Sequence, residues 1–157
     1  MDFTIFNNSV EILDKRKGDK FREEYIHQFV NTNKNSYQEK IQLRRKFIDG
    51  YCYIGYLWDY LTNPVFIEEA YIAKVAENLN SVYVFWDIHS CERIFIKDYW
   101  KFGKDTVLKL DIKTLLAGEE YLPEDIYIFD ESFTWTLIKT HEEIEGKRYC
   151  LKSGDIY

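Results

Sequence analysis

The chain has 157 residues, of which 46% are hydrophobic and 31% charged, and its formal net charge is −6. This length and composition are typical of one globular domain with a single core. The acidic balance argues against nucleic acid as the partner, because phosphate binding requires a concentrated basic face. The sequence shows neither a secretory signal nor an apolar stretch near the ~18 residues that a membrane span needs. We therefore expect a cytoplasmic protein that binds no nucleic acid and no membrane.

The three cysteines, Cys52, Cys91 and Cys150, are widely separated and form no CxxC motif. This pattern argues against a disulfide framework or a structural zinc site, and it favours reduced thiols. A metal site could be assembled from His89, Cys91 and His141, but His-x-Cys is a weak ligand motif. We expect no metal and no cofactor.

The first half of the chain has the apolar spacing of helices. Residues 10–30 predict one helix that is interrupted near Gly18. Residues 36–61 predict a long second helix, because Ser36 and a glutamate three residues later form a capping box before a wide apolar stripe. A third helix is predicted over 67–79, where glutamate and alanine are frequent.

From residue 81 onward the apolar period changes to two, which is typical of strands. The clearest element is a hairpin from Asp125 to Thr140, which turns at residues 130–132. One or two helical turns are predicted over 111–119. The other predicted strands cover residues 81–89, 93–100, 107–112 and 147–152.

Helices precede strands in this order, which favours an α+β fold over alternating βαβ units. We expect a single domain over residues 1–157, with a helical part over about 10–79 and a sheet part over about 81–152. The N-terminal helices should pack on a C-terminal antiparallel sheet of about four to six strands. The seven glycines match neither GxGxxG nor GxxxxGK, so no phosphate-binding loop is predicted.

The returning strand of the hairpin has a large apolar stripe. Phe133, Trp135 and Leu137 should face one side of the sheet, and the alternate residues of 133–138 should face the other. A sheet that packs on helices needs such a stripe, so we interpret Trp135 as a core residue rather than a binding residue.

His141 and Glu142 lie where the returning strand of this hairpin ends. Binding and catalytic residues concentrate at such positions, and histidine can act as an acid, a base or a ligand. One interpretation is catalytic, with His141 as general base oriented by Glu142 or Asp59. The other is a hydrogen-bonded or solvated histidine that only ends a strand. The sequence identifies no second reacting group that would support catalysis.

An acidic segment surrounds this pair. Between Glu119 and Glu145 there are nine acids and one base, Lys139, which gives a local charge of −8. The segment can serve solubility and protect a hairpin edge. It can equally form a partner surface, because concentrated carboxylates complement a basic cleft. The candidate binding residues are Glu119, Glu120, Glu124, Asp130, Glu131, His141, Glu142 and Glu143.

The stretch DIYIFDESFTWTLIKTHE, residues 125–142, resembles the signature of a family of small bacterial proteins of unknown function. The signature begins with Asp, followed by either Ile or Val and then by Tyr. A second Asp comes next, then Phe-x-Trp-Thr, and the signature ends with Thr-His-Glu. Leu57-Trp58 and the strand at 83–86 are also similar to the family, so the resemblance spans about residues 39–143. The positions that fill the signature are Asp125, Tyr127, Asp130, Phe133, Trp135, Thr136, Thr140, His141 and Glu142. The resemblance implies a bacterial cytoplasmic domain and assigns no activity.

Two functions are compatible with these observations. The first is a non-catalytic interaction protein, such as an immunity or antitoxin-type inhibitor that binds a basic toxin enzyme through its acidic surface. The small size, the aromatic richness and the −8 segment favour it. The alternative is a small hydrolytic enzyme that uses His141 as general base.

Overall fold

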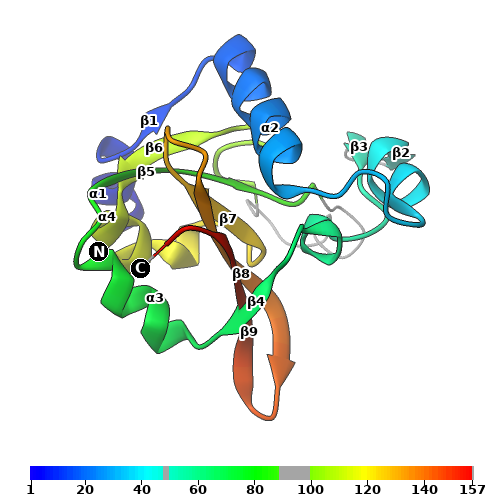
Figure 1. Ribbon diagram of the computed structural model, residues 1–157. Helices are drawn as coiled ribbons and strands as arrows, with labels where there is room; N and C mark the ends of the chain where they lie inside the picture. The colour runs from blue at the N-terminus through cyan, green and yellow to red at the C-terminus, as the bar shows by residue number, and fades with distance from the viewer. Residues whose placement is uncertain (48–49, 89–99, 157) are drawn as a thin grey trace.

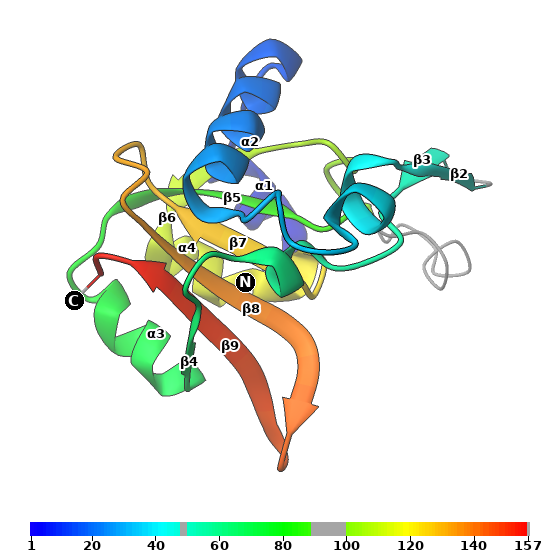
Figure 2. The same ribbon diagram turned by 45° about the vertical axis from the view of Figure 1, so that its right-hand side comes forward.

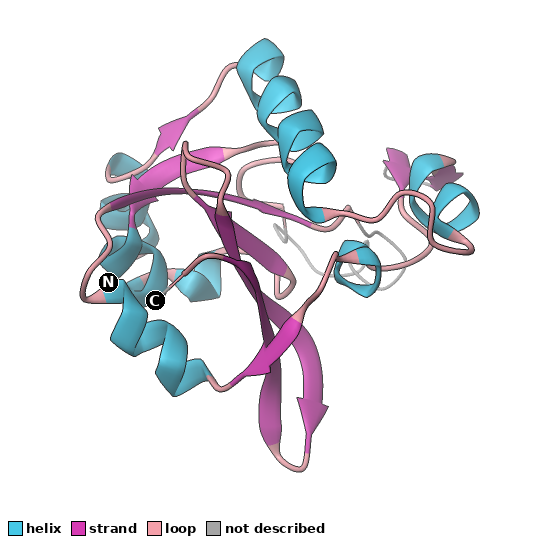
Figure 3. Ribbon diagram, in the orientation of Figure 1, coloured by secondary structure: helices cyan, strands magenta, loops and turns pink. Residues whose placement is uncertain are grey.

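The computed structural model describes residues 1–47, 50–88 and 100–156. The fold is α+β, with helices on both sides of a twisted antiparallel sheet (Figures 1 and 3). The helices are α1 (Phe3–Asn8), α2 (Lys15–Phe29), η1 (Gln38–Gln42), η2 (Leu57–Tyr60), α3 (Glu69–Ala76), α4 (Ile112–Ala117) and η4 (Glu119–Tyr121).

Within the described residues, seven strands form the main sheet in the order β1-β6-β5-β7-β8-β9-β4, and every neighbouring pair is antiparallel. A separate two-stranded sheet pairs β2 with β3. The strands are β1 (Glu11–Ile12), β2 (Arg45–Phe47), β3 (Gly50–Cys52), β4 (Val65–Ile67), β5 (Ser81–Trp86), β6 (Leu108–Asp111), β7 (Ile126–Phe129), β8 (Trp135–Ile144) and β9 (Lys147–Gly154).

The expected four to six strands are too few. The two edge strands, β1 and β4, come from the first half of the chain, which was expected to contribute helices only. Strands of two and three residues are too short for an alternating pattern to be recognised. The predicted strand at 93–100 lies outside the described residues except for Trp100.

The long helix predicted over 36–61 is wrong. This segment contains the short helices η1 and η2 and the hairpin β2–β3 instead. Ser36 has φ 69° and Gly50 has φ 114°, both in the left-handed region that a right-handed helix excludes. By contrast, α2 runs through Gly18 without interruption. It begins at Lys15 and not at residue 10, because Asp14 caps it by accepting from the backbone N–H of Lys17 at 2.9 Å.

The two faces of the sheet have different cores. On one face, α2 contributes Tyr25 and Phe29 to a core rich in aromatic rings, here called the aromatic core, and the Tyr25 hydroxyl lies 2.7 Å from that of Thr136 on β8. On the other face, α1, α3 and α4 contribute to a mainly aliphatic core that contains Trp135 and Leu137. Trp135 is therefore buried, as predicted from the stripe.

Phe133 departs from the stripe and packs against the aromatic core. Its φ of 53° places it in the turn before β8, so the alternation of the strand does not yet apply to it. None of the helices within 1–47, 50–88 and 100–156 is long and apolar enough to cross a bilayer.

Candidate functional site

The returning strand of the hairpin was expected to end at His141, but β8 continues to Ile144, and a β-bulge within it positions His141. Lys139 pairs with Cys150 of β9 and Glu143 pairs with Arg148, so three residues of β8 lie opposite Tyr149 alone. Bulges re-aim side chains and are frequent next to functional sites. The regular part of β8 is almost completely buried, whereas the strand becomes exposed from the bulge onward.

Asp125, directly before β7, holds the imidazole of His141. Nδ1 of His141 lies 3.0 Å from both carboxylate oxygens of Asp125, and the backbone N–H of His141 donates to Oδ1 at 3.1 Å. The indole N–H of Trp58 donates to the same oxygen at 3.0 Å. Asp125 is only 3% exposed, so this carboxylate is fixed and directs Nε2 of His141 outward.

The expected orienting partner of His141 was Glu142 or Asp59, whereas the carboxylate at Nδ1 is that of Asp125. Glu142 contacts the imidazole on its other nitrogen, with Oε1 at 3.4 Å from Nε2. Asp59 is not among the hydrogen-bond partners that the described residues provide for the ring. Partial burial, together with the charge of Glu142, raises the pKa of the Asp59 carboxyl.

A second buried carboxylate lies behind Asp125. The Tyr127 hydroxyl lies 2.6 Å from Oδ2 of Asp87 and accepts from the backbone N–H of Trp58 at 2.9 Å. The backbone N–H of Leu57 donates to Oδ1 of Asp87 at 3.0 Å. Burial, reinforced by the charge of Asp125, raises the pKa of Asp87 well above its usual value. This network anchors η2 on β7 and thereby positions Trp58.

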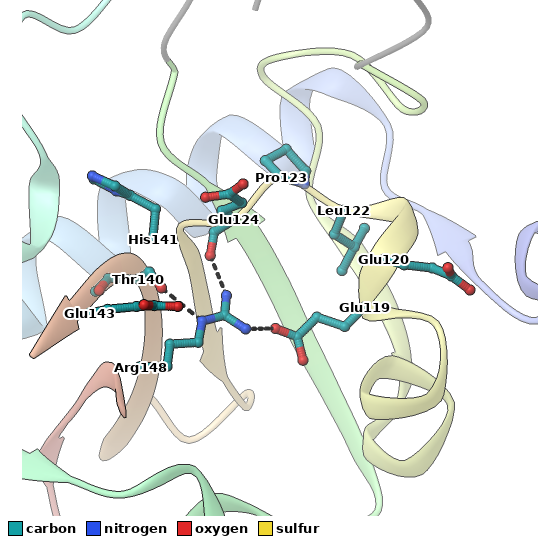
Figure 4. A pocket seen from close by; sticks show the side chains of 9 residues that line it. All are labelled: Glu119, Glu120, Leu122, Pro123, Glu124, Thr140, His141, Glu143 and Arg148. Atoms are coloured by element: carbon teal, nitrogen blue, oxygen red, sulfur yellow. Dashed lines mark hydrogen bonds and ion pairs between the residues drawn. The ribbon is translucent and has the colours of Figure 1, made fainter. Parts of the chain in front are cut away.

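A pocket of about 530 Å³ opens beside the bulge (Figure 4). Arg148 lies in it, and all three of its guanidinium nitrogens donate to the protein itself. Nε donates to the carbonyl of Thr140 at 2.7 Å, Nη2 to that of Glu124 at 2.6 Å, and Nη1 to the Glu119 carboxylate. The imidazole of His141 points away from Arg148 in this view. The lining residues are Glu119, Glu120, Leu122, Pro123, Glu124, Thr140, His141, Glu143 and Arg148.

Glu119 is part of an internal ion-pair network. Its other carboxylate oxygen accepts from Lys139 at 2.6 Å, and Lys139, which is 5% exposed, also pairs with Glu69 of α3 at 2.9 Å. The hydrogen bond from Lys139 lowers the pKa of Glu69. Glu119 therefore joins η4 to β8 and β9, although it was expected to be a surface acid of the binding segment.

The remaining candidate residues fall into two places. Glu120, Glu124 and Glu143 are exposed around the pocket, and Glu142 is exposed beside His141. Asp130 and Glu131 lie at the opposite end of β7, which spans four residues or about 13 Å. The acidic segment is thus divided, and the larger group surrounds the bulge.

Asp130 has a structural role in the turn between β7 and β8. Its Oδ1 accepts from the backbone N–H of Ser132 at 2.9 Å, and its Oδ2 accepts from the indole N–H of Trp135 at 3.0 Å. An aspartate that bonds the backbone two residues later is a common way to stabilise a turn.

The described part of the chain contains no group of three or more His, Cys, Asp or Glu side chains that could hold a metal ion. The metal site considered from the sequence, with His89, Cys91 and His141 as ligands, includes two residues, His89 and Cys91, that lie outside the described part. Cys150 is buried, and burial raises the pKa of its thiol to about 11, which suppresses the reactive thiolate. Among the described residues, no hydroxyl or thiol is hydrogen-bonded to the His141 ring.

The family assignment rests on nearly the whole chain. Residues 4–150 match the family model described as a domain of unknown function, DUF4275. The chain belongs to this family. The resemblance to a family of unknown function is thereby confirmed, and the match extends beyond residues 39–143. No curated protein and no solved structure gives a significant match to the chain.

Sequence reasoning missed Asp125 as the partner of His141, although a usable signal was present. In the hairpin, Ile126 pairs with Lys139, so continuing the register by one residue places Asp125 opposite Thr140. Counting pairs outward from the turn would have brought Asp125 next to His141. Asp87 and Tyr127 gave no comparable signal, because their contacts join elements 40 residues apart in the chain.

Proposed function

We propose that this protein is a non-catalytic interaction protein that binds a basic partner protein, in the manner of an immunity or antitoxin-type inhibitor of a toxin enzyme. Its binding surface would be the exposed acids around the bulge, which we call the bulge acids. They are Glu120, Glu124, Glu142 and Glu143.

The observation that carries this proposal is that the guanidinium group of Arg148 in the pocket is hydrogen-bonded to the protein itself. Four glutamates line the pocket together with this one arginine, and the guanidinium donates to Thr140, Glu124 and Glu119. Three of the five N–H groups of Arg148 are used within the protein, and the Glu119 carboxylate offsets its charge, so it has less capacity left for an incoming anion. The surface therefore offers carboxylate oxygens to the solvent, and a cationic side chain is the complementary ligand.

A toxin enzyme that acts on phosphate esters would provide such a cationic surface, because its cleft must attract negatively charged substrates. An acidic protein of 157 residues is large enough to cover that cleft with a standard interface. An inhibitor of this type would act in the bacterial cytoplasm. The buried thiol of Cys150, which is not in a disulfide, is compatible with a reducing compartment.

The test is capture of partners from a lysate of the source organism by three versions of the protein. One is unmodified, one carries Glu120→Gln, Glu142→Gln and Glu143→Gln, and the third carries Glu11→Gln, Glu23→Gln and Glu131→Gln. All six positions are exposed, and both triple variants lose the same charge. Neither should change the stability much, because exposed substitutions have small effects.

We expect a specific basic protein to be retained by the unmodified protein and by the Glu11, Glu23 and Glu131 variant. It should be lost from the variant of the bulge acids. Equal retention by both triple variants would contradict the proposal, because the net charge and not its location would then decide binding.

The geometry of His141 favours a second candidate, a small hydrolytic enzyme. A buried carboxylate on Nδ1 with an outward-facing Nε2 is the arrangement that lets a histidine take a proton from a water molecule or a substrate. This candidate predicts that His141→Ala and Asp125→Asn abolish turnover in a broad hydrolase screen, whereas the variant of the bulge acids retains it. If the screen finds no turnover in the unmodified protein, the candidate fails.

A further inference from the structure

Five rings form a continuous row across one end of the molecule, which we call the aromatic row. Phe66 stacks on Tyr149 with centroids 5.5 Å apart, and Tyr149 lies 5.7 Å from Trp58. Trp58 stacks on Tyr56 at 5.3 Å, and Tyr56 lies 4.8 Å from the imidazole of His141. Each ring thus contacts the next.

The row joins segments that are far apart in the sequence. It starts on the edge strand β4, crosses β9 and η2, and ends at the bulge of β8. Figure 2 shows β8, β9 and β4 side by side, with the helical turn of residues 57–60 close to them. Trp58 and Tyr149 pack at the margin of the aromatic core, which fixes the row on the fold.

The rings of the row remain accessible, unlike those of the core. Phe66 is 49% exposed, and the other four residues are partly exposed. A contiguous apolar surface of this kind on a soluble domain commonly marks an interaction site. Aromatic residues are also enriched among the residues that dominate binding energies.

Two carboxylates lie next to the row, and Lys34 lies beside one of them, where it donates to the backbone carbonyl of Asp59 at 2.5 Å. Glu142 is half exposed beside the imidazole of His141, and Asp59 is exposed next to Trp58 in the chain. Arg148, the neighbour of Tyr149, is turned into the pocket and bound to Glu119. A partner with phosphates or carboxylates at this place would be repelled, whereas a cationic partner would be attracted.

The protein's own cations lie over other rings. Eight described rings carry a lysine or arginine, and Phe85 under Arg22 at 4.5 Å is one of them. In the described part of the chain, no such cation lies over Phe66, Trp58 or Tyr149. The parts of these rings that are not stacked on another ring of the row are thus available to a cation from another molecule.

We infer that the aromatic row binds an arginine-bearing segment of the partner protein, an inference that rests on the proposed function and specifies its partner. Guanidinium groups would stack on the exposed faces of Phe66, Tyr149 and Trp58, and Asp59 and Glu142 would accept their N–H groups. Arginine fits better than lysine, because its planar cation stacks on rings and donates in the same plane.

The test uses two labelled peptides of equal length and charge, one alternating arginine with glycine and the other lysine with glycine. Fluorescence anisotropy measures their binding to the unmodified protein, to Phe66→Ala and to Tyr51→Ala. Tyr51 is 59% exposed on β3 outside the row and serves as the matched control, since its loss also removes an exposed ring. Thermal melts establish that both variants are folded.

We expect the arginine peptide to bind more tightly than the lysine peptide. Phe66→Ala should weaken its binding about two- to five-fold, as expected for one exposed cation–π contact, while Tyr51→Ala should leave it unchanged. Equal binding of the two peptides, or equal effects of the two substitutions, would overturn the inference. So would the absence of saturable binding up to about 1 mM peptide.

These outcomes are independent of the test of the proposed function. Phe66→Ala and Tyr51→Ala keep the net charge unchanged, so they leave the bulge acids in place. If the variant of the bulge acids loses its partner while the two peptides bind equally, or while Phe66→Ala and Tyr51→Ala have equal effects, the proposed function stands and this inference fails. If the variant of the bulge acids captures its partner as well as the control does, the proposed function itself fails.

Discussion

The two ends of β7 use aspartate in opposite ways. At the turn, Asp130 accepts from Ser132 and Trp135, which are at most five residues away. At the other end, Asp125 accepts from Trp58, which is 67 residues away, and from His141. The first carboxylate stabilises a local turn, whereas the second joins three separate elements.

This difference explains why the candidate site lies at one end of the hairpin only. A turn built from neighbouring residues satisfies its own polar groups and leaves few of them for another molecule. Long-range contacts at Asp125 instead hold η2 and the bulge of β8 together, so that Nε2 of His141 and the nearby rings face outward. The following predictions test this contrast.

The largest effect should come from the tryptophan at the turn end. Trp135→Ala should lower the free energy of unfolding by about 3–5 kcal/mol, because it empties a buried ring site in the aliphatic core. Trp58→Ala should lower it clearly less, because Trp58 is partly exposed. Urea denaturation measures both. Similar losses of unfolding free energy in the two variants would mean that Trp58, at the candidate site, belongs to the core as much as Trp135 does.

Replacing Asp125 and replacing Asp130 should lower the free energy of unfolding by different amounts in the same urea assay. Asp125→Ala should cost about 3 kcal/mol, because it leaves several donors without an acceptor, among them the Trp58 indole. Asp130→Ala should cost about 1 kcal/mol, because water can reach the donors of the more exposed turn. The contrast fails if Asp130→Ala is the more damaging change.

A third comparison concerns the acids of the segment. Glu119→Gln should cost about 2 kcal/mol, because it weakens the ion pairs of the buried Lys139 and of Arg148. Glu131→Gln is the matched control and should change stability by less than about 0.5 kcal/mol, since it is exposed at the turn. If urea denaturation detects no decrease in the free energy of unfolding of Glu119→Gln, this glutamate is a surface acid like Glu131.

The smallest effect should be a change in pH dependence. Because the pKa of Asp87 is raised in the folded state, its carboxyl stays protonated there when the unfolded chain ionises. This contribution to stability is present below about pH 4 and is lost as the pH rises towards the folded pKa. Asp87→Asn removes the titration, so its stability relative to the unmodified protein should increase from pH 4 to pH 7. A constant difference would show that Asp87 ionises normally.

Local patterns predicted much of the fold. The hairpin of β7 and β8 and the helix α3 have the periodicity and turn residues that identify such elements. The segment 36–61 also has an apolar helical stripe, yet its backbone is decided by left-handed residues and by contacts with distant elements. The stripe alone contains neither kind of information.

The candidate site could be predicted only in part. His141 stood out because it was expected to end a strand, although β8 in fact continues past it to Ile144. Its orienting carboxylate was sought among its neighbours and at Asp59. Asp125 acts across a hairpin register, and Trp58, which stacks on Tyr56, is held at the site by a buried network. Such contacts depend on the tertiary arrangement and have no local pattern.

The most direct measurement of the central claim is the salt dependence of partner association. The association rate of the captured partner should be compared between about 50 mM and about 500 mM salt, because screening acts on exposed charges. We predict a steep decrease for the unmodified protein and for the Glu11, Glu23 and Glu131 variant, and a much weaker one for the variant of Glu120, Glu142 and Glu143. The same salt dependence in all three would contradict the claim that the bulge acids form the binding surface.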